Sequence, residues 1–127
     1  MNLIVPPDKL ADVWPKVSEW IESAVRQNQG DENLLDVLIA IARGHYMLWH
    51  CPGKWAAVSQ VQRYPRQVVA VVLYCGGSDI ESMRECFEYG KQWARENGVH
   101  VVRTYGRRGW ARVMELNEQG VILQAVL

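Results

Sequence analysis

The sequence lacks an excess of charge of either sign. Its 14 basic residues balance its 14 acidic residues, so the formal net charge is zero when the histidines are neutral. Nucleic acids and anionic membrane surfaces attract proteins through a surplus of lysine and arginine. Net charge therefore gives no reason to expect either partner, and we expect the protein to bind neither a nucleic acid nor a membrane.

Long apolar runs and a cysteine framework are also missing. No stretch approaches the ~20 apolar residues that a membrane-spanning helix needs, and residues 1–7 lack the basic segment of a signal peptide. Cys51, Cys75 and Cys86 are odd in number and do not have the spacing of metal ligands. This pattern predicts free thiols in a reducing compartment, without a zinc site. We therefore expect a cytoplasmic protein.

Phenylalanine is scarce, whereas tryptophan is abundant. One Phe stands against six Trp, in a chain that is 49% apolar and 22% charged. That composition is typical of a globular protein. Tryptophan is large and amphipathic, so we expect some of the six at the edge of the core or at an interface. Because the 127 residues contain no repeat, low-complexity tract or linker, we expect one domain over residues 1–127.

The first third of the chain predicts a short strand followed by two helices. Residues 3–5 are a strand candidate that two prolines close. Apolar residues then recur at spacings of three and four over residues 10–25, which indicates one face of a helix. Pro15 either begins the main part of this helix or kinks it. Asp31 is expected to cap a second helix over residues 34–41.

After residue 45 the pattern changes to that of strands. Residues 46–51, 55–64 and 68–74 predict three strands joined by tight turns, which form an antiparallel meander. The third of these is an unbroken apolar run, typical of a central strand that is covered on both faces.

The rest of the chain predicts a helix and further α and β elements. Ser78 and Glu81 form a capping box for a helix that ends at residues 97–98. Residues 99–105 predict a strand parallel to the central one, because a crossover helix joins the two. A short helix near residues 110–114 and a strand over residues 121–126 complete the order β-αα-βββ-α-β-α-β.

Over nearly the whole chain, this order resembles the GNAT (Gcn5-related N-acetyltransferase) fold, an α/β (α+β) architecture with a mixed central sheet. The short GNAT-like proteins of tailed phages are the more similar members. That similarity rests on Leu48-Trp49, Tyr64-Pro65, Gly76-Gly77 and the Gly-Arg-Arg-Gly-Trp motif of residues 106–110. The resemblance implies the GNAT fold and, in its enzymes, transfer of an acetyl group from acetyl-CoA to an amine.

The resemblance also implies a cofactor site at the start of the helix that follows the central strand. There a helix amino terminus offers free N–H groups to the pyrophosphate of acetyl-CoA. The matching residues are Tyr74, Cys75, Gly76, Gly77 and Ser78. The family's basic or Gln residue is absent from this loop, and Asp79 and Glu81 follow in the first helical turn. The departure leaves two interpretations open: a degenerate acetyl-CoA site, or an ordinarily capped helix that binds no cofactor.

A proton donor is the second requirement of the GNAT reaction. The tyrosine that supplies the proton in many GNAT enzymes falls on Glu115 here, and Tyr105 is the nearest phenol. A base would be a carboxylate, water or a histidine near the strand ends, for which His45, His50 and Glu115 are candidates.

A basic cluster lies in the same part of the chain. Arginine recurs four times in ten residues, interleaved with aromatic residues: Arg103, Arg107, Arg108 and Arg112, with Tyr105 and Trp110. Guanidinium groups bind phosphate, carboxylate or the acidic patch of a protein partner. A solvated cluster at a helix end is the alternative interpretation, and of the possible partners a protein is favoured over a nucleic acid.

Two functions follow from these observations. The first is a non-catalytic, virion-associated or assembly protein in the host cytoplasm or the virion, whose partner is another protein or a second copy of itself. The alternative is an N-acetyltransferase with acetyl-CoA as its cofactor and an unidentified amine as its acceptor. The acidic first turn after Ser78 favours the first function. An unpaired strand over residues 121–126 would also invite strand addition from a partner.

Overall fold

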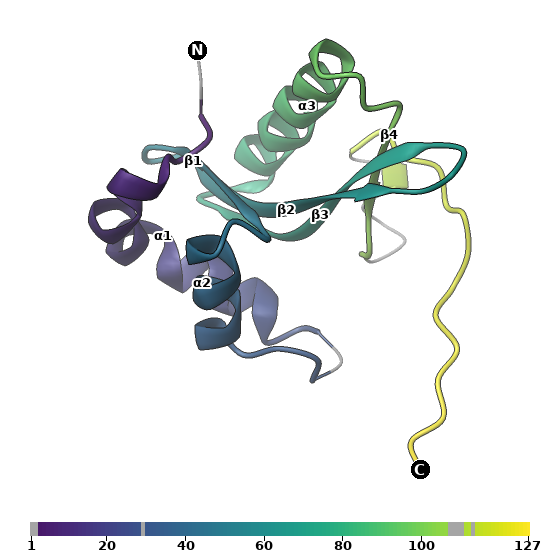
Figure 1. Ribbon diagram of the computed structural model, residues 1–127, viewed down its shortest axis with the longest axis horizontal. Coiled ribbons are helices and arrows are strands. Elements are labelled where there is room, and N and C mark those ends of the chain that lie inside the picture. Colours follow the sequence, from purple (N-terminus) through teal and green to yellow (C-terminus); the bar gives the residue numbers. More distant parts are fainter. Residues whose placement is uncertain (1–2, 29, 107–110, 113) are drawn as a thin grey trace.

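A four-stranded sheet forms the centre of the protein, and helices cover both of its faces (Figure 1). The computed structural model describes residues 3–28, 30–106, 111–112 and 114–127. The strands lie in the order β1-β2-β3-β4 and span Met47–Cys51, Trp55–Arg63, Val68–Gly77 and Val101–Thr104. The sheet therefore follows the order of the chain, and the long helix between β3 and β4 crosses over one face.

The sheet has the predicted strand directions. β1 to β3 form the antiparallel meander, and β4 is parallel to β3. Both predictions are confirmed. The predicted first strand is reduced to one bridge between Ile4 and Trp49, with Val5 N–H donating to the Leu48 carbonyl at 2.8 Å. This segment extends the sheet beyond β1.

Three α-helices pack on the sheet. α1 (Leu10–Val25) and α2 (Leu34–Ala42) cover one face, and α3 (Ile80–Glu96) covers the other (Figure 1). A 3-10 turn over Pro7–Lys9 precedes α1, and Pro15 lies inside α1 with its side chain exposed. Within the described part of the chain, no helix is both long and apolar enough to cross a bilayer.

The start of α2 differs from the prediction. Asn33, rather than Asp31, is the N-cap. Its side-chain oxygen accepts the Asp36 N–H at 2.9 Å, while the Asp36 carboxylate accepts the Asn33 N–H at 2.9 Å. The reciprocal pair satisfies two N–H groups at once, which a cap by Asp31, three residues before the helix begins, would not do.

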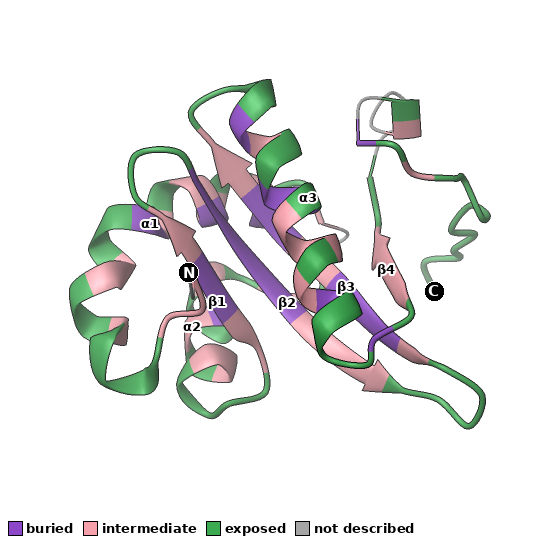
Figure 2. Cartoon of the chain, turned by 90° about the horizontal axis from the view of Figure 1, so that it is seen from above, coloured by how far each residue is buried: buried purple, intermediate pink, exposed green. Residues whose placement is uncertain are grey.

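Separate apolar clusters fill the two faces of the sheet, and burial follows the strands (Figure 2). On the α1 face the buried side chains are Val17, Ile21, Val25, Val37, Leu48, Ala56, Val58 and Tyr74. On the α3 face they are Trp49, Trp55, Ala57, Cys75, Cys86, Phe87 and Met114. The Trp49 ring meets Tyr89 and Trp93 edge to face, and its indole N–H donates to Ser59 Oγ at 2.8 Å. Of the five tryptophans that the structure describes, Trp49 and Trp55 thus lie in the core.

The prediction of a carboxyl-terminal strand over residues 121–126 is wrong. Residues 117–127 contain no strand, and Figure 1 shows them running away from the sheet. Val121 is 66% exposed and Leu123 is 88% exposed. A mostly apolar segment forms a strand only where a neighbouring strand supplies hydrogen bonds, and this segment has none in the described chain. Of the predicted short helix, Ala111 and Arg112 are helical, whereas residues 107–110 and 113 lie outside the described residues.

Candidate functional site

The carboxyl end of β3 diverges from β4. Only residues 69–72 of β3 pair with residues 101–104 of β4. Val72 and Tyr74 pair with consecutive residues of β2, which leaves Leu73 as a bulge. β3 then continues to Gly77 beside β2. Backbone groups of residues 73–77 that point away from β2 therefore have no strand partner in the described part of the chain.

The two glycines of the predicted cofactor loop belong to β3 instead. Gly76 pairs with Ala56 and Gly77 with Trp55, so these two residues form the end of a strand and not a loop. A Cβ atom on Gly76 would lie 2.7 Å from the Trp20 carbonyl oxygen. On Gly77 it would lie 2.7 Å from the Lys54 carbonyl oxygen. Glycine is needed at both positions because the chain's own backbone approaches closely from two sides.

Acceptors of the chain itself bind N–H groups at the amino end of α3. Ser78 N–H donates to the Lys54 carbonyl at 2.9 Å, and Ser82 N–H donates to Asp79 Oδ1 at 2.8 Å. Backbone hydrogen bonds, chiefly from Ser82 and also from Glu81, hold the pKa of the Asp79 carboxyl below its usual value.

The cap of α3 is therefore Asp79, and the predicted capping box of Ser78 and Glu81 is wrong. The physical reason is that β3 runs on to Gly77, so the backbone of Ser78 is bound to Lys54 and the helix begins one residue later. The Glu81 carboxylate instead pairs with Arg84 at 3.6 Å.

Tyr74 takes part in a polar cluster that ties the α1–α2 loop to the sheet. The Tyr74 hydroxyl donates to Glu32 Oε1 at 2.6 Å, and the Tyr46 hydroxyl donates to Glu32 Oε2 at 2.8 Å. Asn28 Nδ2 donates to the Tyr74 oxygen at 3.3 Å and to the Glu32 carbonyl at 3.1 Å. One carboxylate thus joins two tyrosines that are 28 positions apart in sequence.

These contacts change the ionisation of both phenols. Burial, then the hydrogen bond and charge of Glu32, raise the pKa of Tyr46 to about 12. Burial and the Glu32 hydrogen bond raise the pKa of Tyr74 as well, and the Asn28 donor opposes that rise. Both phenols therefore stay protonated at neutral pH and serve as donors to the carboxylate.

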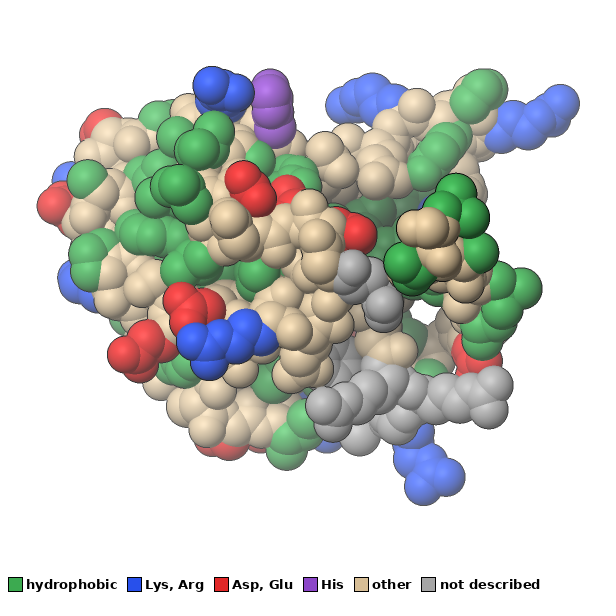
Figure 3. Space-filling view, turned by 90° about the horizontal axis from the view of Figure 1, so that it is seen from below, with side chains coloured by type: hydrophobic (Ala, Val, Ile, Leu, Met, Phe, Trp, Pro, Cys, Tyr) green, Lys and Arg blue, Asp and Glu red, His purple; other side chains and the backbone are tan. Residues whose placement is uncertain are grey.

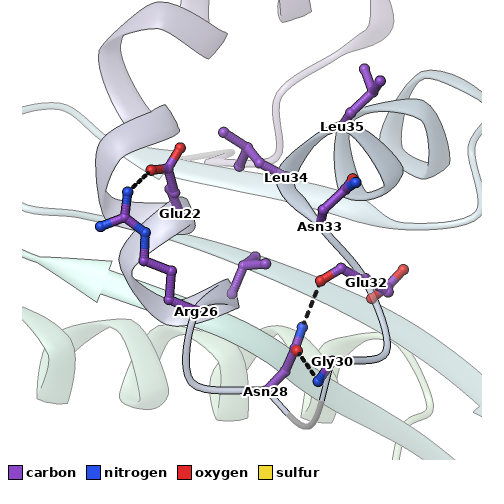
Figure 4. A pocket seen from close by; sticks show the side chains of 9 residues that line it. Glu22, Arg26, Asn28, Gly30, Glu32, Asn33, Leu34 and Leu35 are labelled. Atoms are coloured by element: carbon purple, nitrogen blue, oxygen red, sulfur yellow. Dashed lines mark hydrogen bonds and ion pairs between the residues drawn. The ribbon is translucent and has the colours of Figure 1, made fainter.

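A hollow of about 500 Å³ lies beside this cluster, between the end of α1 and the start of α2 (Figure 4). Polar and apolar residues line it: Glu22, Val25, Arg26, Asn28, Gly30, Glu32, Asn33, Leu34 and Leu35. The Glu22 and Arg26 side chains form an ion pair on one wall, and Asn28 Oδ1 accepts the Gly30 N–H at 2.8 Å. The hollow is large enough to admit a small polar group or a side chain of a partner.

The remaining candidates lie in different settings. Tyr105 follows β4 and is 61% exposed, whereas the exposed Glu115 lies in a turn with a φ of 54°. His45 is exposed, and burial followed by the charge of Lys16 lowers the pKa of the half-buried His50. No set of three metal-ligating side chains is placed to hold a metal ion in the described ranges.

The predicted arginine cluster is described only in part. Arg103 is half-buried in β4 opposite Val71, and Arg112 is exposed. Arg107, Arg108 and Trp110 lie outside the described residues.

Sequence reasoning missed Glu32 altogether. It is one of 14 acidic residues and belongs to no motif. Its two tyrosine partners come from the residue before β1 and from β3, so only the tertiary structure brings the three side chains together.

Comparison with solved structures identifies the fold. A probable acetyltransferase has a TM-score of 0.70 at 10% identity, over 98% of this chain and 94% of its own. The aminoglycoside acetyltransferase meta-AAC0020 from an uncultured soil metagenomic sample, solved with sisomicin, has a TM-score of 0.68 at 12% identity. The match covers 98% of this chain and 93% of that protein. A mutant of TTHA1254 from Thermus thermophilus has a TM-score of 0.63 at 15% identity, and the match covers 97% of this chain and 93% of that protein.

The chain therefore has a GNAT-like fold, with a mixed sheet and helices on both faces, as the resemblance predicted. No protein-family model and no curated protein sequence matches the chain.

The Glu32 cluster predicts a tyrosine titration that depends on this carboxylate. Because the pKa of Tyr46 is raised to about 12 in the folded state, its contribution to stability is complete below the ordinary value near 10. That contribution is lost as the pH rises towards 12. Glu32→Gln removes the negative neighbour, so the late part of the tyrosinate absorbance curve should move to lower pH. The Glu32→Gln substitution should also lower the free energy of unfolding by roughly 1–3 kcal/mol.

Glu22→Gln is the matched control, because Glu22 lines the same hollow and pairs with Arg26 instead of a tyrosine. An ultraviolet pH titration of the three folded proteins makes the comparison. Superimposable titration curves for wild type and Glu32→Gln would contradict the hydrogen bonds that we assign between Glu32 and the two tyrosines.

Proposed function

We propose that this GNAT-fold chain is a non-catalytic binding protein that does not use acetyl-CoA as a cofactor. The observation that carries the proposal is the amino end of α3. A pyrophosphate site there needs free backbone N–H groups and a favourable charge. Ser78 N–H is bound to Lys54, Ser82 N–H is bound to Asp79, and the Asp79 carboxylate occupies the place where an anion would bind. A dianionic pyrophosphate would have to displace that carboxylate against charge repulsion.

The two glycines support the same conclusion. Glycine at a cofactor loop lets a ligand approach the backbone. Here the Trp20 and Lys54 backbones already lie within 2.7 Å of the positions where Cβ atoms would stand on Gly76 and Gly77. Internal packing already explains why both positions are glycine. The two glycines therefore give no independent reason to expect a ligand.

The partner that we propose is a second copy of the chain or another protein of the same assembly. Figure 3 shows apolar side chains gathered on the side of the sheet that carries α1 and α2 and along the carboxyl-terminal segment. Leu35 is 62% exposed on α2, and Leu123, Val126 and Leu127 are each at least 88% exposed. Large contiguous apolar surface usually marks an interface.

Each chain also offers both halves of a strand-addition contact. Residues 121–126 are an uncharged, strand-forming segment without a strand partner, and in the described part of the chain β4 is paired only on its β3 side. A twofold dimer would pair the segment of each copy with the β4 edge of the other. The similarity to short phage proteins favours a virion-associated or assembly role, in the host cytoplasm or the virion.

An N-acetyltransferase is the second candidate, and one observation favours it. Beyond Leu73 the edge of β3 away from β2 has no strand partner in the described chain, and an extended acyl chain could bind to that edge. Under this alternative Glu32 is the residue that we would assign to amine recognition, since it is an acidic residue that lines a hollow of about 500 Å³. The acceptor amine would then enter between α1 and α2.

Calorimetric titration with acetyl-CoA and with CoA tests the choice between the two functions. The proposal predicts no binding heat up to millimolar ligand at modest ionic strength. Micromolar binding that Ser78→Glu abolishes and Ser23→Glu leaves unchanged would overturn it. Ser78 precedes the α3 cap and Ser23 lies on α1; both are exposed, so the two variants add the same charge at different places.

Light scattering on a size-exclusion column tests the self-association. The proposal predicts a dimer at micromolar concentration for the full chain and a monomer for a chain that ends at Gly120. Leu123→Asp should weaken the dimer at least tenfold, because it places a charge in the added strand. Gln119→Asp, an exposed change outside the segment, should leave it intact. A full chain that is monomeric at these concentrations would contradict the contact.

A further inference from the structure

Two cysteines meet in the core between β3 and α3. Cys75 Sγ and Cys86 Sγ lie 3.5 Å apart, although the residues are 11 positions apart in sequence. Their residues are 7% and 5% exposed. A disulfide has an S–S length of about 2.05 Å, so the two sulfur atoms need to approach by about 1.5 Å to form one. The fold thus brings together two thiols for which the sequence had predicted no relationship.

The environment of the pair opposes ionisation of Cys86. The hydrogen bond with Cys75 and burial hold the pKa of the Cys86 thiol well above its usual value. Because the thiolate is the reactive form of cysteine, we expect oxidation of the pair to be slow and to need an oxidant small enough to enter the core.

Space for a small oxidant exists on the same side of the sheet. A cavity of about 30 Å³ borders Cys86, Gly90 and Trp93. A volume of this size accommodates a molecule similar to water, which is also the size class of hydrogen peroxide. No atom lies within 4 Å of the position of a Cβ on Gly90, so this side of α3 has open space.

We propose that Cys75 and Cys86 form a redox modification site at which a small hydroperoxide produces an internal disulfide between β3 and α3. The sulfur of one thiol attacks one peroxide oxygen and breaks the O–O bond, giving a sulfenic acid and releasing the other oxygen as water with that thiol's proton. The sulfur of the second thiol then attacks the sulfenic sulfur, and the sulfenic hydroxyl leaves as water with the second thiol proton. Two thiols are oxidised to one disulfide, and one hydrogen peroxide is reduced to two waters.

The disulfide would hold the segment that starts α3. The closed loop runs from Cys75 to Cys86 and includes Gly76, Gly77 and the Asp79 cap. Closing this loop restricts the unfolded chain and attaches the beginning of α3 to the sheet. Oxidation should therefore raise the melting temperature. The site is independent of whether the protein binds acetyl-CoA.

The full chain, reduced and then treated with hydrogen peroxide, tests the proposal. Alkylation in denaturant counts the thiols, and peptide mass spectrometry locates any cross-link. Reactive thiols should fall from three to one, leaving Cys51, because the sequence has three cysteines. A peptide that joins Cys75 to Cys86 should appear with the mass of two hydrogens missing. The accompanying rise in melting temperature should disappear after treatment with dithiothreitol.

Cys51→Ser is the matched control and should retain the cross-link and the rise in melting temperature. Cys75→Ser and Cys86→Ala should lose both, and circular dichroism before oxidation establishes that each variant is folded. The proposal is overturned if folded wild-type protein keeps Cys75 and Cys86 fully alkylatable after peroxide treatment. It is also overturned if Cys51 supplies one end of the cross-link.

Discussion

Two backbone carbonyl groups approach the end of β3 closely, and this approach determines the geometry of the connection between β3 and α3. The Trp20 oxygen from α1 and the Lys54 oxygen from the β1–β2 turn leave no room for side chains at Gly76 and Gly77. β3 continues beside β2 as far as Gly77. Because of this extension, the N-cap of α3 is Asp79 and not Ser78, and the N–H groups of Ser78 and Ser82 find acceptors within the chain.

The same stretch of β3 contributes to a polar cluster on one face of the sheet and to a pair of cysteines on the other. Beyond the bulge at Leu73, Tyr74 points to the α1 face and binds Glu32, while Cys75 points to the α3 face and meets Cys86. Neighbouring residues of one strand thus contribute to two unrelated clusters. A fold shared with acetyltransferases does not settle the chemistry, because function depends on the groups placed in the site. The proposal of a binding role therefore depends on the groups at the amino end of α3 and not on the fold.

Much of the fold could be predicted because its signals are local. The apolar period of α1, the alternation of the β1–β3 meander and the crossover to a parallel β4 each appear within a short window of sequence. The GNAT-like fold followed from their order. The cap at Asp79 was missed because the helix start depends on where β3 stops, and β3 is held by contacts with Trp20 and Lys54 that no local pattern reveals. Residues 121–126 have the composition of a strand, but the structure gives them no neighbour.

The site was harder to predict than the fold. The sequence pointed to Tyr74 and Cys75 as backbone contacts of a cofactor, whereas their side chains make the contacts that matter in the structure. Glu32 lies in a loop between two helices, and its two hydroxyl donors come from distant strands or their flanks. Such a cluster depends on the packing of α1 and α2 against the sheet, which composition and spacing do not encode.

The central claim is that the amino end of α3 is already filled by the chain's own acceptors. Backbone amide NMR during a titration with acetyl-CoA tests this most directly, residue by residue. The account predicts that the N–H resonances of Gly76, Gly77, Ser78 and Ser82 keep their positions up to millimolar ligand. Progressive shifts confined to these amides, saturating at micromolar ligand, would contradict it and would place an acetyl-CoA pyrophosphate at the start of α3.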